Sequence, residues 1–171
     1  MVAAAAALLR RLRLAIALAV KCPAIRVDAV DISAEALDIA KQNAKRHGVA
    51  ERLRFFHGDG FNALAAGTRF ELIVSNPPYI PTSEIETLEP EVRDHDPRHA
   101  LDGGPDGLDI FRRWAAQAAQ FLNATGRMML EFGDGQDQAV CELLEKQNWI
   151  VENVLADYTQ RPRLLIARRA N

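Results

Sequence analysis

The chain has 171 residues, of which 49% are hydrophobic, so its length suits one compact domain better than two. Its 21 basic and 23 acidic residues give a formal net charge of -2, which argues against duplex nucleic acid as the partner. Two distant cysteines, Cys22 and Cys141, form no CxxC pair, so neither a disulfide framework nor a zinc site is expected. A reducing cytoplasm is therefore the expected location.

The amino-terminal segment is rich in alanine and leucine. Residues from about Ala3 to Val20 favour a helix by propensity, and Pro23 ends that stretch. A cleaved leader is not expected, because no small-x-small site follows the apolar part before Lys21. Three arginines interrupt any apolar run of about 18 residues, so no membrane span is predicted.

The rest of the chain alternates between strand and helix patterns. Ser33 is a good N-cap for a helix that runs to about His47, and Gly48 is its stop signal. The inward stripe of this helix is predicted to be Ala36, Leu37, Ile39, Ala40 and Ala44. Further helices are expected over Asp109 to Leu122 and Gln136 to Gln147. Strands are expected over Arg26 to Val30, Leu53 to Phe56, Phe70 to Ser75, Arg127 to Phe132, Val151 to Ala156 and Arg163 to Ala167.

This alternation predicts an α/β fold with a mostly parallel sheet. The last two strands are joined by a polar turn that contains Pro162, so they are expected to form an antiparallel pair. No linker or repeat divides the chain, which predicts a single domain over residues 1–171.

The tetrapeptide Asn76-Pro77-Pro78-Tyr79 directly follows a predicted buried strand. Consecutive prolines fix φ and lack N–H groups, so the backbone here is stiff and extended. The Asn76 side chain and the Pro77 carbonyl can then accept hydrogen bonds from one planar NH2 group, beside the apolar ring of Tyr79. The pattern predicts a binding site for an amide or amino nitrogen, and an ordinary strand-ending turn is the alternative.

Acidic residues follow the two preceding strands. Asp31 can accept hydrogen bonds from the two hydroxyls of a ribose, or it can serve only as a helix N-terminal charge. Asp59, Gly60 and Phe61 can present an acceptor and an apolar wall to an adenine ring, or form a simple turn. Because ligands bind outside the carboxyl ends of parallel strands, these residues and Asn76 are expected to converge on one rim as a nucleoside pocket.

Four stretches carry a resemblance to a known family: VDAVDISAEALDIAKQNA, FFHGDGF, ELIVSNPPYIP and LEPEVRDHDPRHALDGGPDGLD. They resemble the HemK/PrmC family, the S-adenosylmethionine-dependent methyltransferases that modify the glutamine of the Gly-Gly-Gln loop of class I peptide chain release factors. NPPY alone is shared with adenine amino-methyltransferases, whereas the segment from Leu88 to Asp109 is much more specific.

The resemblance implies a Rossmann-like class I methyltransferase fold and a role for each motif residue. Asp31 would hold the cofactor ribose, and Asp59 with Gly60 would contact the adenine region, where some relatives carry an aromatic in place of Gly60. Asn76 would touch cofactor and substrate, and Pro77, Pro78 and Tyr79 would complete the glutamine site. The implied cofactor is S-adenosylmethionine and the implied partner is a release factor, with no metal and no membrane.

The resemblance stops near the amino terminus. Class I methyltransferases open with a strand and a glycine-rich turn, but no glycine precedes Gly48 here, and alanines, leucines and arginines occupy about Ala6 to Leu12. Residues 1–13 are thus atypical, the family's helical substrate-binding domain is expected to be absent, and a degenerate first strand and weak cofactor binding are predicted. A nucleic-acid adenine methyltransferase and an inactive binding module are the alternative functions.

Overall fold

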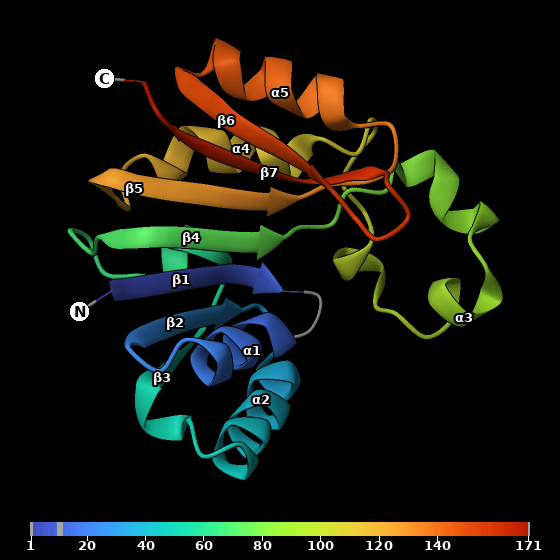
Figure 1. Ribbon diagram of the computed structural model, residues 1–171. Helices are drawn as coiled ribbons and strands as arrows, with labels where there is room; N and C mark the ends of the chain where they lie inside the picture. Colours follow the sequence, from blue (N-terminus) through green and yellow to red (C-terminus); the bar gives the residue numbers. More distant parts are fainter. Residues whose placement is uncertain (1, 10–11, 171) are drawn as a thin grey trace. The chain divides into compact units, whose positions relative to one another are not determined.

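The computed structural model describes residues 2–9 and 12–170. Within these ranges the strands form a sheet in the order β3-β2-β1-β4-β5-β7-β6 (Figure 1). They are β1 (Val2–Leu9), β2 (Ile25–Asp31), β3 (Leu53–His57), β4 (Phe70–Asn76), β5 (Leu122–Glu131), β6 (Trp149–Ala156) and β7 (Pro162–Arg169). The α-helices are α1 (Arg13–Lys21), α2 (Ala34–Arg46), α3 (Pro90–Arg93), α4 (Asp109–Ala118) and α5 (Asp137–Lys146). The predicted α/β class is confirmed.

The chain separates into two compact units. The first comprises residues 1–75 and 118–129, and the second comprises residues 76–117 and 130–171. The prediction of a single domain over residues 1–171 stays a prediction.

The predicted helix over Ala3 to Val20 is wrong in its first half. Val2–Leu9 forms strand β1, which pairs in parallel with β2 from Val2 opposite Ile25 to Ala7 opposite Val30. Alanine favours a helix, but a short isolated helix is marginal in water, whereas a strand here satisfies the backbone groups of β2. The first strand is therefore present despite its atypical sequence. Residues 10 and 11, where part of the family's glycine-rich turn was expected, lie outside the described residues.

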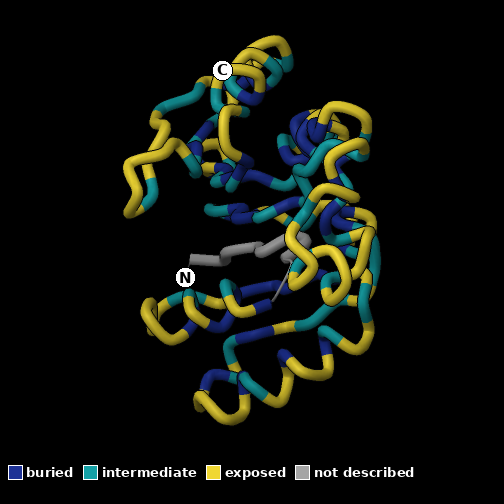
Figure 2. The backbone as a smooth tube through the Cα atoms, turned by 90° about the vertical axis from the view of Figure 1, so that its right-hand side faces the viewer, coloured by how far each residue is buried: buried dark blue, intermediate teal, exposed yellow. Residues whose placement is uncertain are grey.

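Helices α1 and α2 cover one face of β2 and β3 in the first unit (Figure 1). Strand β2 is buried continuously from Val27 to Asp31, as is typical of an inner parallel strand. The alternation of buried and exposed positions along the chain is visible in Figure 2. The core of this layer consists of Leu12, Ala15, Ile16, Ala19, Val27, Ala29, Leu37, Ala40, Ala44, Val49 and Leu53. The predicted inward position of Ile39 is wrong, because its side chain is 53% exposed.

The predicted limits of α2 are confirmed. Ser33 is the N-cap, and its Oγ accepts a hydrogen bond of 3.1 Å from the Ala36 N–H. Gly48, at φ +67°, follows the last turn in the left-handed conformation that glycine adopts without strain. The N-cap at Ser33 determines where α2 begins after β2, and Asp31 lies at this junction.

In the second unit, β6 and β7 form the predicted antiparallel pair, with Val151 opposite Ala167. Helix α4 ends at Ala118 rather than at Leu122, because Leu122 already begins β5, which starts five residues earlier than predicted. The indole N–H of Trp149 donates to the Ala115 carbonyl at 2.9 Å and ties α4 to β6. Among the described residues, no helix is long and apolar enough to cross a membrane.

Candidate functional site

Asp31 is the last residue of β2, and its side chain is buried, with only 6% of the residue exposed. Its Oδ1 accepts a 2.8 Å hydrogen bond from the N–H of Ser33, just ahead of the first turn of α2. The carboxylate therefore lies at the positive end of the helix dipole, which stabilises its charge. This geometry suits both the N-terminal charge and the ribose role that the sequence left open.

The loop after β3 lies beside Asp31. Asp31 pairs with His57 in the parallel register of β2 and β3, and the N–H of Gly58 donates to the Asp31 carbonyl at 3.0 Å. Asp59 is partly buried and leads into the short turn Gly60–Ala63. The structure thus brings two of the predicted cofactor-binding residues, Asp31 and Asp59, to the same end of neighbouring strands.

Gly60 and Phe61 are both buried. Gly60 has φ +54°, a left-handed conformation in which an aromatic side chain would be strained. Phe61 is 2% exposed, and its ring stacks on that of Phe121 with centroids 4.9 Å apart. Phe61 is therefore a core residue that anchors the loop. Its ring has little exposed surface with which to contact an adenine.

Asn76 ends β4, and the side-chain oxygen of Asn76 is buried without a hydrogen-bond partner among the described residues. A buried amide oxygen that forms no hydrogen bond costs about 1–3 kcal/mol, so native proteins rarely leave one without a purpose. An acceptor held in this state is suited to an N–H donor supplied by a ligand. Pro77, next along the chain, is also buried.

The chain after Asn76 is braced against residues 101–104. The Ile80 N–H donates to the Leu101 carbonyl at 3.0 Å, and the Gly103 N–H donates to the Ile80 carbonyl at 2.9 Å. The Thr82 N–H donates to the Gly104 carbonyl, also at 2.9 Å. Part of the family-specific Leu88 to Asp109 segment therefore serves as a backbone support for the Asn-Pro-Pro-Tyr segment.

Asp102 stabilises this support through its side chain. Its Oδ1 accepts from Thr82 Oγ1 at 2.6 Å and from the Gly104 N–H at 3.0 Å, and Arg98 lies nearby. These contacts, led by the Thr82 hydroxyl, lower the pKa of the Asp102 carboxyl below its usual range. Asp102 was not singled out by the sequence, because one of its partners, Thr82, is 20 residues away in the chain.

Substituting Asp102→Asn should destabilise the protein by roughly 1 kcal/mol at pH 7, because the donors lose their charged acceptor. A lowered pKa means that the ionised Asp102 stabilises the fold fully above its unfolded pKa of about 3.9 and loses this effect as the pH falls through the folded value. Urea unfolding of both proteins at pH 7 and near pH 3 should show the difference disappearing in acid. A difference that does not change with pH would contradict the assignment.

Gln136 was also not singled out by the sequence. Its Nε2 donates to the Tyr79 carbonyl at 2.9 Å, and its Oε1 accepts from the Gly133 N–H at 2.9 Å. One carboxamide thus joins the Asn-Pro-Pro-Tyr segment to the loop that follows β5. Nothing in the sequence pattern alone marked this glutamine, because one of its two backbone partners, the Tyr79 carbonyl, is 57 residues away in the chain.

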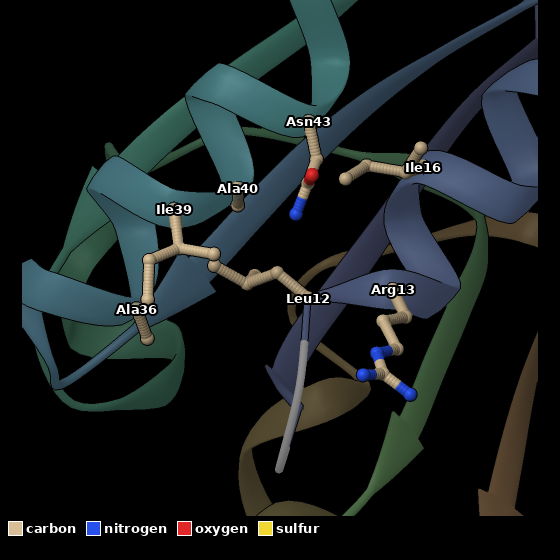
Figure 3. Close-up of a pocket in the computed structure, with 7 residues that line it drawn as sticks. All are labelled: Leu12, Arg13, Ile16, Ala36, Ile39, Ala40 and Asn43. Atoms are coloured by element: carbon tan, nitrogen blue, oxygen red, sulfur yellow. The ribbon is translucent and has the colours of Figure 1, made fainter. Parts of the chain in front are cut away.

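A groove of about 270 Å³ separates α1 from α2 in the first unit. Figure 3 shows Leu12, at the start of α1, and Ile39, on α2, extending toward each other across it. No predicted site residue lines this groove. The exposed position of Ile39 on its edge explains why the hydrophobic pattern of α2 misplaced that residue in the core.

The described residues contain no group of three or more His, Cys, Asp or Glu side chains placed to hold a metal ion. The predicted convergence of Asn76 with Asp31 and Asp59 stays a prediction, because these residues belong to different units.

The relatives found by sequence comparison are methyltransferases. Residues 13–89 match the family model of the methyltransferase small domain. The chain is 46% identical over 133 residues to a release factor glutamine methyltransferase of Geobacter sulfurreducens, covering 78% of this chain and 46% of the relative. It is 43% identical over 157 residues to one of Moorella thermoacetica, covering 91% and 55%. The chain spans about half the length of these relatives.

Solved structures support the fold. A methyltransferase from Pyrococcus furiosus matches with a TM-score of 0.72 at 17% identity, over 99% of this chain and 75% of that chain. A ribosomal protein L11 methylase from Lactobacillus delbrueckii matches with a TM-score of 0.69 at 20% identity, over 99% and 70%. At these identities the similarity concerns the fold alone, which is that of class I methyltransferases.

Proposed function

We propose that this chain, which is similar to release factor glutamine methyltransferases, transfers a methyl group from S-adenosylmethionine to the side-chain amide of the glutamine in the Gly-Gly-Gln loop of a class I release factor. Since the chain spans about half of its curated relatives, its activity, cofactor and partner all belong to the proposal. A cytoplasmic location follows from a partner that works in translation.

The observation that carries the proposal is the buried Asn76 oxygen, which forms no hydrogen bond with any residue that the structure describes. A primary amide brings two N–H donors in one plane, and one of them can satisfy this acceptor. The Pro77 carbonyl is the proposed second acceptor, held in a fixed direction by the stiffness of the two prolines. Tyr79 is proposed to pack its ring beside the bound amide.

The Asn76 side-chain oxygen and the Pro77 carbonyl together are called the amide clamp. This clamp compensates for the poor nucleophilicity of the amide nitrogen. The lone pair of an amide nitrogen is delocalised into its carbonyl, so the nitrogen attacks poorly. Two acceptors that hold the N–H bonds orient the nitrogen and favour the tetrahedral geometry that it takes in the transition state for methyl transfer. No dedicated base is needed before transfer, because the excess proton of the methylated nitrogen is acidic and can leave to solvent.

Asp31 and the loop at Asp59 are the proposed cofactor-binding residues. The bound cofactor would supply an electrophilic methyl group on a sulfonium. A buried carboxylate beside a helix N-terminus can accept hydrogen bonds from ribose hydroxyls, and Gly60 allows the backbone to approach the adenine region closely. Cofactor binding is expected to be weak, because no glycine precedes Gly48 in this chain.

The proposal is tested by incubating the chain with a release factor and radiolabelled S-adenosylmethionine at millimolar concentration. Label should enter the release factor and not a variant whose Gly-Gly-Gln glutamine is replaced by alanine. Label in DNA with none in the release factor would favour the adenine methyltransferase instead. Capture of the release factor in a pull-down without any methyl transfer would favour the inactive binding module.

A further inference from the structure

We infer that Gln136 is a positioning residue that fixes the far end of the amide clamp through the Tyr79 carbonyl, an inference that rests on the proposed function. The Gln136 carboxamide donates to the Tyr79 carbonyl and accepts from the Gly133 N–H, each at 2.9 Å. Its orientation is determined by chemistry, since a carbonyl cannot donate and a backbone N–H cannot accept. Only a group with a donor and an acceptor in one plane satisfies both partners.

Three glycines leave just enough room for this contact. A Cβ on Gly107 would lie 2.6 Å from Gln136 Nε2 and would overlap the Tyr79 carbonyl, and one on Gly133 would lie 2.8 Å from Gln136 Oε1. A Cβ on Gly103 would lie 2.8 Å from the Tyr79 Cα. The glycines therefore form a slot in which the Tyr79 backbone and the glutamine side chain meet without space for another side chain.

The Asn-Pro-Pro-Tyr segment is therefore held at both ends. Strand β4 fixes Asn76, and Gln136 fixes the carbonyl of Tyr79, with only the two stiff prolines between them. Stiff backbone transmits a displacement instead of absorbing it. Loss of the Gln136 contact should therefore move the clamp acceptors, and displacements of about 1 Å can cost about 100-fold in rate.

The test compares Gln136→Glu with Gln138→Glu, which makes the same charge change on an exposed residue in the first turn of α5, the helix that Gln136 precedes as its N-cap. Gln136→Glu keeps the acceptor for Gly133 but, when ionised, cannot donate to Tyr79. At pH 8 we expect its kcat for methyl transfer to fall by roughly 10- to 100-fold, with KM for the cofactor within about twofold. The control should match the unmodified protein.

Lowering the pH gives a second readout. A protonated glutamate donates an O–H where glutamine donates an N–H, so the relative kcat of Gln136→Glu should recover as the pH falls toward its carboxyl pKa, ordinarily about 4.3. Recovery distinguishes the hydrogen bond from general damage to the fold. Equal rates for Gln136→Glu and Gln138→Glu at every pH would overturn the inference.

Hydrogen exchange separates this inference from the proposed function. In Gln136→Ala the amides of Ile80, Thr82 and Gly133 should exchange at least about tenfold faster than in the unmodified protein, since their support is lost. This holds whether or not a release factor is methylated, so an inactive protein would refute the proposed function and leave the exchange data to decide the support. Unchanged exchange in those segments would refute the support itself.

Discussion

Asn76→Ala should lower kcat/KM for methyl transfer to the release factor by about 100- to 1,000-fold, the range expected when one preorganised hydrogen-bonding group is removed from a reacting centre. The same change should leave the free energy of unfolding within about 0.5 kcal/mol of its original value or raise it. The physical reason is that the Asn76 oxygen is already buried without a partner, so its removal breaks no hydrogen bond of the described residues.

Steady-state kinetics and urea unfolding, measured on the same preparations, check this combination. Asn153→Ala, a change at an exposed residue of β6, is the matched control and should alter neither quantity. Loss of activity together with a loss of several kcal/mol of stability would show that Asn76 supports the fold and not the substrate.

Asp31→Ala should lower kcat/KM for S-adenosylmethionine by about 100-fold, mainly through KM, because two hydrogen bonds from ribose hydroxyls to a charged acceptor would be lost. Alanine also removes the acceptor for the Ser33 N–H and should cost about 1 kcal/mol of stability. Asp31→Asn keeps that acceptor, so it should retain stability while still losing about tenfold in kcat/KM.

Initial rates measured at cofactor concentrations below KM give kcat/KM directly. The enzyme therefore does not have to be saturated with a weakly bound cofactor. Asp38→Ala removes an exposed acidic residue of α2 and should leave kcat/KM unchanged. If Asp31→Asn and Asp38→Ala behave alike, Asp31 is only a helix N-terminal charge, which is the alternative that the sequence left open.

Much of the architecture was readable from local patterns. The N-cap at Ser33, the stop at Gly48 and the continuous apolar character of β2 are encoded within a few residues, so α2 and its strand were placed to within one or two positions. The largest error, the helix predicted where β1 lies, has a physical cause. Strand β1 is made of residues that favour a helix, and only pairing with β2 decides its conformation.

The residues of the candidate site differ in the same way: some can be proposed from local patterns, and others depend on contacts with distant residues. Asp31, Asp59 and Asn76 could be proposed from the sequence because each lies at or just after the end of a strand and has a side chain suited to a nucleoside or an amide, and their roles stay predictions. Phe61 could not be assigned, because a phenylalanine in a loop can face a ligand or the core, and its stacking on Phe121 depends on a residue sixty positions away.

Local patterns are enough to predict the fold class, the family resemblance and the stiffness of the Asn-Pro-Pro-Tyr segment, because periodicity, turn residues and proline geometry are properties of short stretches of sequence. Three features depend on the tertiary structure: β1 is a strand, the Asn76 oxygen has no hydrogen-bond partner among the described residues, and Asp102 and Gln136 hold the Asn-Pro-Pro-Tyr segment in place. β1 is a strand because it pairs with β2, and the contacts of Asp102 and Gln136 join groups 20 and 57 residues apart, which no local pattern specifies.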